Sequence, residues 1–402
     1  MPCEIATYGE DVEHDPGAFD AERFIEEAVR HLGAAGVAGV TSSGDYPGCL
    51  VAAVIARELG LPGPAPESVL RCSHKYYARL AQRAAVPEAT PRFALIDPSA
   101  LDAGSVGLPF PLFVKPVKSW FSQYARRVDT FEQLQRFVSS PGVRAHLARF
   151  VRPFDQLLTR FPGFAYHGGY MLAEELLTGH QVTLEGFVQG GTMRVVGIVD
   201  SVMYGDTLSF KRFNYPSSVS AGVARRMTLI AERVMAHIGF DDGLFNMELF
   251  YDKRTDALHI VEVNPRMCAQ FADLMESVNG VNTYEILVAV ATGRRAPALR
   301  RQARFSVATS FVFRHFTDAT VAAVPNEARI DAIKATFPVT LLSTSYGQGQ
   351  RLSDTEYEFD GYSYRYAIVN MAGDHEASLE RDLAAVRGQL GLRLEPVPPD
   401  TG

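Results

Sequence analysis

The sequence has few cysteines, no excess of basic charge and no long apolar run. Its 4 cysteines lie far apart and form no Cys-x-x-Cys pair, which argues against a zinc site or a disulfide framework. Its 39 Lys and Arg residues are outnumbered by 46 Asp and Glu residues, which gives a formal net charge of −7. Since a general nucleic-acid-binding protein normally carries a basic face, no nucleic-acid partner is expected.

The absence of long apolar segments also bears on location. No stretch approaches the roughly 20 apolar residues that span a bilayer, and the acidic N-terminus MPCEIATYGEDVEHD lacks the apolar centre of a signal peptide. We therefore expect a cytoplasmic protein with no membrane partner. What the chain does have is length, because 402 residues exceed one ordinary core and predict two or more domains.

Apolar periodicity divides the chain into predicted helices and strands. Helical spacing predicts helices at 19–32, 50–59, 75–85, 130–138, 221–238 and 281–292. Short apolar or alternating runs predict strands at 36–42, 110–116, 169–176, 182–189, 193–203, 244–251 and 257–263. The early alternation of helix and strand predicts a small parallel-sheet domain. The turn at Thr178-Gly179, taken in isolation, predicts a hairpin between its two flanking strands.

Two of these strands carry a pair of acids. Glu248 lies in FNMELF and Glu262 lies in IVEVNPR, and a short polar turn joins the two strands. An antiparallel pair brings these acids together across the ladder, with Asn264 on the same face as Glu262. Three oxygen ligands on one face suit Mg²⁺. A structural salt bridge, for example to Arg266, is the alternative role for these acids.

A lysine ends the predicted strand 110–116. Lys115 in PLFVKP projects a positive charge beyond the strand, and a lysine ammonium suits phosphate. The loop 117–127 adds Lys118, Ser119 and other basic or hydroxyl side chains, and we expect it to fold over phosphates. A solvated strand end is the alternative for Lys115, and a plain surface position is the alternative for Lys75 at the start of helix 75–85.

The order of these features resembles that of the ATP-grasp superfamily over residues 75–293. A lysine comes first, then strand-lysine-proline with its loop, the acidic segment AEELLTG, a strand with Glu, and Glu-x-Asn-Pro-Arg. The resemblance is nearest to the branch of L-amino-acid ligases and biotin-carboxylase-like enzymes. It implies an α/β (α+β) protein with the ATP-grasp fold. The implied parts are an N-terminal Rossmann-like pre-ATP-grasp domain (1–72), a small subdomain with the phosphate loop (73–170), a large subdomain with the Mg²⁺ site (171–300) and a C-terminal small lid-side subdomain (301–402).

The resemblance also implies residues that bind ATP. They are Lys75, Lys115, Lys118, Ser119, Glu174, Glu175, Leu177, Gln181, Glu185 and Lys211. In the family pattern two lysines hold the phosphates, here Lys75 and Lys115. The loop 118–124 closes over the triphosphate. The backbone of the segment around Glu175 and Leu177 reads the adenine edge, and Gln181 or Glu185 faces the ribose.

A second group of residues is implied for the metal and the chemistry. Glu248, Glu262 and Asn264 would be the ligands of Mg²⁺, with Mn²⁺ as the alternative ion. Arg266 and Lys115 would be the catalytic residues, since Arg266 matches the arginine that steadies an acyl phosphate. Other candidates on the acceptor side are Gln270 and His315, and Lys211 with Arg212 would add charge near the phosphates.

The chain departs from the family pattern at three places. The phosphate loop 117–127 contains no glycine and includes Trp120 and Phe121, whereas a glycine lets backbone N–H groups approach phosphate closely. Gln181 stands where the family has a glutamate for the ribose hydroxyls. After NPR, the family often has a pair of glycines, but here Met267 and Cys268 follow.

The resemblance predicts an ATP-dependent carbon–nitrogen ligase. It would activate a small carboxylate as an acyl phosphate and pass it to an amine, with an amino acid or a related metabolite as the expected substrate and a homodimer as the assembly common in related enzymes. Three alternatives stay open: a nucleotide-binding pseudo-enzyme or regulatory module, a small-molecule kinase, and a bicarbonate-dependent carboxylase. The missing GGGGKG-type loop and the missing Met-Lys biotin-attachment motif argue against the last.

Overall fold

The computed structural model describes residues 16–104, 106–120, 122–299 and 304–397. The helices are α1 Ala21–Ala35, α2 Leu50–Glu58, α3 Pro66–Ser73, α4 Lys75–Ala85, α5 Phe131–Val138, α6 Pro141–Ala145, α7 Arg152–Leu158, α8 Ala221–Ile238, α9 Ala272–Asn279, α10 Thr283–Ala291, α11 Glu327–Thr336 and α12 Glu376–Leu390. Cys49, Cys72 and Cys268 are free thiols. Cys3 and the acidic N-terminus lie outside the described residues.

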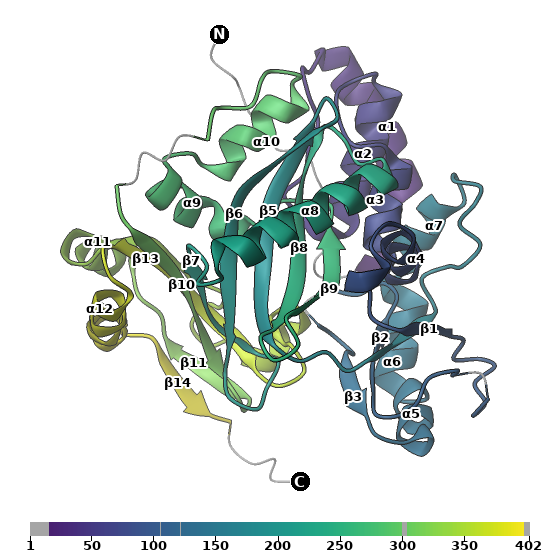
Figure 1. Ribbon diagram of the computed structural model, residues 1–402. Helices are drawn as coiled ribbons and strands as arrows, with labels where there is room; N and C mark the ends of the chain where they lie inside the picture. Colours follow the sequence, from purple (N-terminus) through teal and green to yellow (C-terminus); the bar gives the residue numbers. More distant parts are fainter. Residues whose placement is uncertain (1–15, 105, 121, 300–303, 398–402) are drawn as a thin grey trace.

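A four-stranded sheet forms the smaller of the two main layers. Its order is β1-β4-β2-β3, and each neighbouring pair is antiparallel. The strands are β1 Phe93–Ile96, β2 Leu112–Pro116, β3 Arg126–Val128 and β4 Met171–Glu175. Figure 1 shows this sheet with α5 and α6 as a lobe at the lower right of the molecule.

An antiparallel sheet of eight strands forms the centre of the molecule. Its order is β12-β13-β10-β7-β6-β5-β8-β9. The strands are β5 His180–Gln189, β6 Thr192–Met203, β7 Phe210–Tyr215, β8 Gly243–Asp252, β9 Ala257–Asn264, β10 Val307–His315, β12 Val339–Thr344 and β13 Tyr364–Gly373. Strands from the C-terminal hundred residues thus extend the sheet that carries the two acids, while β11 Ala319–Ala323 pairs with β14 Arg393–Pro396.

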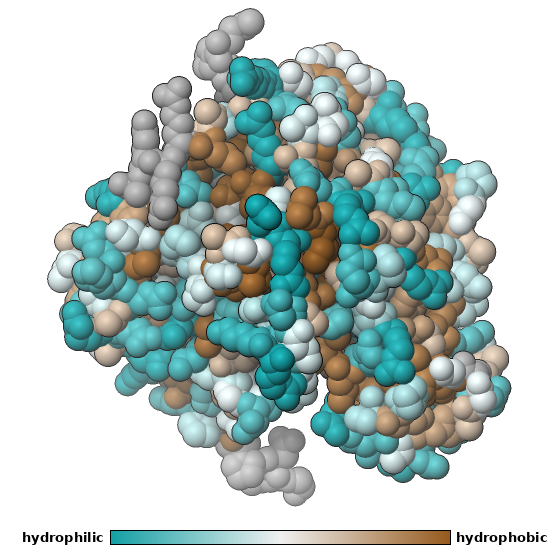
Figure 2. All heavy atoms as spheres, viewed as in Figure 1, coloured by the Kyte–Doolittle hydropathy of each residue, from teal (hydrophilic) through white to brown (hydrophobic). Residues whose placement is uncertain are grey.

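Helices cover the two faces of the eight-stranded sheet. On one face, α8 and the N-terminal helices pack on apolar residues such as Val182, Leu184 and Leu249. On the other face, α9 and α10 pack on residues such as Phe187 and Val199. Because side chains alternate along a strand, Gln181, Thr183 and Glu185 of β5 point away from α8. Figure 2 shows hydrophilic residues over most of the visible face, with apolar ones in smaller areas between them. Within the described residues, no helix is both long and apolar enough to cross a membrane.

Most predicted elements form, but two predictions are wrong. Residues 36–42 do not form a strand, and no described strand precedes β1, so the predicted parallel sheet is absent from residues 16–92. Gly36 ends α1 in the left-handed conformation, and Gly39 passes so close to α10 that an added Cβ would lie 2.3 Å from the carbonyl oxygen of Ala291. The glycines of this segment therefore serve helix termination and close packing rather than a strand.

The predicted hairpin around Thr178-Gly179 is also wrong. Strand β4 belongs to the four-stranded sheet and β5 belongs to the eight-stranded sheet, so the turn joins two sheets. Gly179 has φ of +134°, and a Cβ there would lie 2.5 Å from the carbonyl oxygen of Tyr251. Sequence pattern alone does not separate a hairpin turn from a connection between sheets, because both need a glycine and polar residues.

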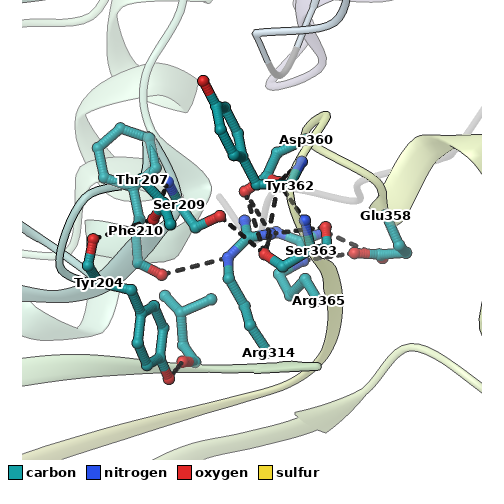
Figure 3. Close-up of polar contacts among 11 residues, drawn as sticks. Tyr204, Thr207, Ser209, Phe210, Arg314, Glu358, Asp360, Tyr362, Ser363 and Arg365 are labelled. Carbon is teal, nitrogen blue, oxygen red and sulfur yellow. Dashed lines mark hydrogen bonds and ion pairs between the residues drawn. The ribbon is translucent and has the colours of Figure 1, made fainter. Parts of the chain in front are cut away.

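A buried polar network anchors the segment before β13 to the central sheet. Arg314 of β10 pairs with Asp360 at 2.7 Å, and both side chains are 8% exposed. Arg314 also donates to the hydroxyl of Ser363, which lies 2.8 Å from the hydroxyl of Ser209 in the β6–β7 loop. Figure 3 shows these contacts together with the ion pair between Arg365 and Glu358. The network fixes the segment 356–363 against the β6–β7 loop.

We expect Asp360→Asn to destabilise the fold, because it leaves the buried Arg314 guanidinium without its counter-ion. Loss of one partner of a buried ion pair costs about 3–5 kcal/mol. The matched control is Asp256→Asn, which removes the exposed pair with Arg226 and should change stability by less than about 1 kcal/mol. Urea unfolding of both variants tests this expectation. Equal urea concentrations at the unfolding midpoints of the two variants would contradict a stabilising role of the Arg314–Asp360 pair.

Candidate functional site

The candidate site is a narrow pocket lined from both sheets and from the N-terminal helices. Residues 176–179, which join β4 to β5, connect the two sheets directly. The lining includes eight residues that carry charge or an amide: Asp45, Lys75, Arg79, Gln82, Lys115, Lys118, Glu262 and Asn264. The two predicted phosphate lysines, the phosphate-loop lysine and two of the three predicted metal ligands are thus brought together.

The lysines of the pocket are held by carboxylates from different elements. Lys115 Nζ at the end of β2 lies 2.8 Å from Glu174 of β4, and Lys75 Nζ at the start of α4 lies 3.5 Å from Glu262 of β9. The backbone N–H of Lys75 donates to the carbonyl of Val117 at 2.9 Å, which ties α4 to the phosphate loop. Burial lowers the pKa of Lys115, although Glu174 opposes this effect.

Glu174 has two cationic partners. Its side chain is 4% exposed and also pairs with Arg79 of α4, which in turn donates to the carbonyl of Val261 at 2.8 Å. Burial alone would raise the pKa of Glu174, but Arg79 and Lys115 outweigh it and the pKa falls to about 2. The side chain of Glu174 therefore braces the two cations.

The acidic pair has the predicted register. Glu248 of β8 lies opposite Glu262 of β9, and Asn246 lies opposite Asn264. The amide of Asn264 donates to the side-chain oxygen of Asn246 at 3.3 Å. Burial and the neighbouring Glu262 raise the pKa of Glu248, whereas Lys75 and Lys115 outweigh burial and lower the pKa of Glu262. Two carboxylates face one another here, with an amide oxygen nearby.

These donors fit a hard divalent cation. Carboxylate and amide oxygens are the ligands that Mg²⁺ takes in proteins, and two adjacent carboxylates repel one another unless a cation or a proton lies between them. Within the described ranges, no group of three or more His, Cys, Asp and Glu side chains is suited to hold a metal. A metal at this place therefore needs an amide such as that of Asn264, or oxygens from a bound phosphate, to complete its ligands.

The pocket also contains buried polar atoms without a partner. The hydroxyl of Ser73 and the amide nitrogen of Gln82 belong to residues that line it, and neither atom has a hydrogen-bond partner among the described residues. Buried polar groups are rarely left unpaired, because an unmade hydrogen bond costs about 1–3 kcal/mol. Together with Lys75, Lys115 and Lys118, these atoms fit an anionic ligand with several polar groups.

The phosphate loop takes a backbone conformation that usually needs glycine. Ser122 has φ of +56° and Tyr124 has φ of +54°. This conformation costs a non-glycine residue about 1–2 kcal/mol. The loop thus adopts the left-handed conformation at two residues that are not glycine. Ser119, at the start of the loop, is buried. Phe121 lies outside the described residues.

Aromatic contacts hold this loop on two sides. Trp120 packs against Phe150 with ring centroids 4.8 Å apart, and against Tyr46 at 6.1 Å. It also meets Tyr357 of the C-terminal region, edge to face, at 5.3 Å. Tyr357 adjoins Glu358, which the network of Figure 3 holds in place. The loop is therefore in contact with the C-terminal region as well as with the N-terminal helices.

The predicted adenine and ribose residues occupy the connection between the sheets and the start of β5. Glu175 ends β4 and binds Arg92 through its side chain, and Leu177 follows in the connection itself. Gln181 donates to Glu248 at 2.9 Å, so its amide faces the acidic pair. Glu185 is fully buried, accepts from Asn246 at 2.9 Å and from the N–H of Cys268 at 2.8 Å, and burial raises its pKa to about 7.

Eleven predicted residues do not line this pocket. Seven of them are Glu174, Glu175, Leu177, Gln181, Glu185, Glu248 and Arg266, and Glu174, Glu248 and Arg266 contact or lie opposite residues that do line it. The other four have their contacts elsewhere. Lys211 is exposed on β7, and Arg212 pairs with Glu380 of α12. Gln270 donates to the hydroxyl of Ser310 at 2.7 Å, and the ring of His315 contacts Thr317. None of them is among the residues that line the pocket.

Asp45, Arg79, Gln82 and Asn246 belong to the site but are not among the residues predicted from the sequence. Asp45 lies 3.5 Å from Lys118 and 3.3 Å from Arg266, and these two cations outweigh burial and lower its pKa to about 2. It lies in SSGDYPG, a segment that the sequence assigns to the N-terminal Rossmann-like domain and not to the site. Asn246 was detectable, because it stands two residues before Glu248 and alternation puts both on one face.

Comparison with known proteins identifies the fold. Residues 108–274 match the family model of the ATP-grasp domain. The structure is similar to that of L-amino acid ligase from Bacillus licheniformis, with a TM-score of 0.72 at 16% identity over 93% of this chain and 85% of that chain. It is also similar to the biotin carboxylase domain of 2-oxoglutarate carboxylase from Hydrogenobacter thermophilus, solved with MgADP, ADP and bicarbonate, with a TM-score of 0.62 at 15% identity over 93% and 78% of the two chains.

A third solved structure is also similar in fold. N5-carboxyaminoimidazole ribonucleotide synthetase from Thermus thermophilus has a TM-score of 0.59 at 15% identity over 93% of this chain and 86% of that chain. No curated protein matches the sequence. Residues 108–274 thus match the ATP-grasp domain, and the structure has the ATP-grasp fold, as the sequence predicted.

We predict that nucleotide binding changes the fluorescence of the protein. Trp120 is the single tryptophan, and it lies in the loop beside Lys118, so a phosphate held by this loop alters its surroundings. Titration with ATP and Mg²⁺ should change the tryptophan emission, and Tyr357→Leu should reduce the change because one ring contact is lost. Unchanged emission at a nucleotide concentration that calorimetry shows to be saturating would contradict a loop contact with the ligand.

Proposed function

We propose that the protein is an ATP-dependent carboxylate–amine ligase that forms an amide bond through an acyl phosphate. The observation that carries the proposal is the convergence, in one pocket, of three lysines with the carboxylate of Glu262, the amide of Asn264 and the nearby Arg266. Cations suit a triphosphate, paired acids suit the metal that accompanies it, and an arginine suits a substrate carboxylate.

In this proposal the chain positions the reactants and neutralises their charge. Lys75, Lys115 and Lys118 hold phosphate oxygens, and the backbone of residues 175–177 holds the adenine. Mg²⁺ on Glu248, Glu262 and Asn264 would add charge neutralisation at the phosphates. An oxygen of the substrate carboxylate attacks the γ-phosphorus, a new P–O bond forms, the bond to the bridging oxygen breaks, and ADP leaves with its electron pair.

The second step uses the same residues. The amine nitrogen attacks the acyl carbon, and Arg266 stabilises the oxyanion that forms. The C–O bond to the phosphate breaks, inorganic phosphate leaves, and the proton lost from the amine accompanies it. The loop around Trp120 keeps water away from the acyl phosphate, which would otherwise hydrolyse.

One alternative has a specific observation in its favour. The glycine-free phosphate loop, with Ser122 and Tyr124 in left-handed conformations, fits a module that binds a nucleotide without turnover. Against this stands the cluster of Glu248, Glu262 and Asn264, which a protein under no catalytic demand has little need to keep complete.

A phosphate-release screen tests the proposed function. Purified protein, ATP and Mg²⁺ are mixed with pairwise pools of amino acids and small amines, and active pools are analysed by mass spectrometry. A ligase should release phosphate only when two substrates are present, and its product should be one water lighter than their sum. A stable phosphorylated product would indicate a kinase, a bicarbonate requirement would indicate a carboxylase, and nucleotide binding without any turnover would favour the binding module.

We expect Glu262→Gln to lower turnover by about 100-fold or more, because it removes a charge that acts on the transferred phosphate. Circular dichroism should stay unchanged, since the side chains of Glu262 and its partner Lys75 are 29% and 14% exposed and water can solvate the charge that remains. The matched control is Glu88→Gln on the surface, with a side chain that is 58% exposed, which should keep wild-type turnover. Near-normal phosphate release by the Glu262 variant would remove it from the site.

A further inference from the structure

A surface cleft lies on the other side of α4 from the phosphate pocket. It has a volume of about 420 Å³ and is lined by α3, α4, the segment 162–164 and the last turn of α8. The residues of α4 that face the cleft are Tyr77, Leu80 and Ala81. Those that face the phosphate pocket are Lys75, Ala78, Arg79 and Gln82. At about 3.6 residues per turn the two sets lie on opposite faces of the helix, so the cleft is separate from that pocket.

Aromatic side chains form part of the wall of this cleft. The rings of Tyr77 and Phe164 meet edge to face with their centroids 4.9 Å apart. The hydroxyl oxygen of Tyr77 accepts a hydrogen bond of 2.8 Å from the backbone N–H of Tyr166, whose ring packs on Tyr76 at 5.3 Å. These contacts fix the rings in place, while Tyr77 and Phe164 each stay partly exposed. A ligand with an aromatic ring suits such a wall, because aromatic rings attract one another in offset and edge-to-face arrangements.

A positive charge lies at the same cleft. Arg71 of α3 lines the cleft and is exposed, and its guanidinium donates to the carbonyl oxygen of Ile238 at 3.2 Å rather than to an acid. Glu67, the acid among the lining residues, pairs instead with Arg57 at 3.0 Å. Neither contact neutralises Arg71, and a guanidinium binds a carboxylate through two parallel hydrogen bonds. The ring of His237 adds a further polar group to the lining.

We propose that this cleft is a second ligand site, which binds a small aromatic carboxylic acid with its ring against Tyr77 and Phe164 and its carboxylate on Arg71. The volume of the cleft falls within the range of about 300–1,000 Å³ that small-molecule sites span. A ligand with a single negative charge matches the one guanidinium of the lining better than a phosphate does, since Glu67 repels additional negative charge. The site does not depend on the proposed ligase function, because no residue that lines the cleft also lines the phosphate pocket.

The test compares a charged probe with its neutral analogue by direct binding. 3-Phenylpropanoate and 3-phenylpropanamide are titrated by calorimetry into the full chain. The wild type should bind the carboxylate about tenfold or more tightly than the amide, because hydrogen bonds between ionised partners are the stronger ones. Arg71→Gln should remove this preference and leave the affinity for the amide unchanged. The matched control is Arg225→Gln, at an exposed position of α8 outside the cleft, which should keep the preference.

A second variant tests the aromatic wall. Phe164→Leu keeps an apolar side chain and should weaken the binding of both probes by about twofold to tenfold, which is the range expected from loss of one aromatic pair. The assignment is overturned if 3-phenylpropanoate does not bind the wild type, or if the wild type binds both probes equally. It is also overturned if Arg71→Gln, folded by circular dichroism, binds the carboxylate as tightly as the wild type does, because the ligand then lies elsewhere.

Discussion

Pairing of buried charges between elements that are far apart in sequence is the interaction on which the site depends. Lys115 cannot be buried beside Arg79 without a counter-ion, and Glu174 supplies it to both. In the same way Asp45 offsets Lys118 and Arg266. The pairs draw α4, both sheets and the segment before α2 towards one pocket. These pairs hold the lysines close together before any ligand binds. Without them, the negative charge of a bound triphosphate would have to overcome the repulsion between the lysines.

A short connection joins the two sheets. Residues 176–179 join β4 directly to β5, and Gly179 adopts a conformation that other residues avoid. The phosphate loop bridges on its other side to Tyr357, whose segment is fixed by the pair of Arg314 and Asp360. The loop is therefore supported from the C-terminal region.

Much of the fold and part of the candidate site could be predicted from the sequence. Periodicity predicted α4, α8, β8 and β9 nearly to the residue, and the alternation of side chains predicted that Glu248 and Glu262 face one another. The predicted strand at 36–42 failed because an apolar, glycine-containing run has the same pattern whether it pairs with a strand or packs closely on a helix. The hairpin at Gly179 failed because local pattern does not say which sheet a strand joins. Asp45 and Arg79 were missed because their roles arise from contacts across about 70 to 220 positions of the chain.

The most direct test of the account is a crystal structure with a non-hydrolysable ATP analogue and Mg²⁺. The account predicts phosphate density among Lys75, Lys115 and Lys118, metal density within about 2.0–2.1 Å of oxygens of Glu248 or Glu262, and the adenine against residues 175–177. A nucleotide bound elsewhere would contradict the account. So would a nucleotide whose phosphates lie far from both ion pairs, Lys115 with Glu174 and Lys75 with Glu262.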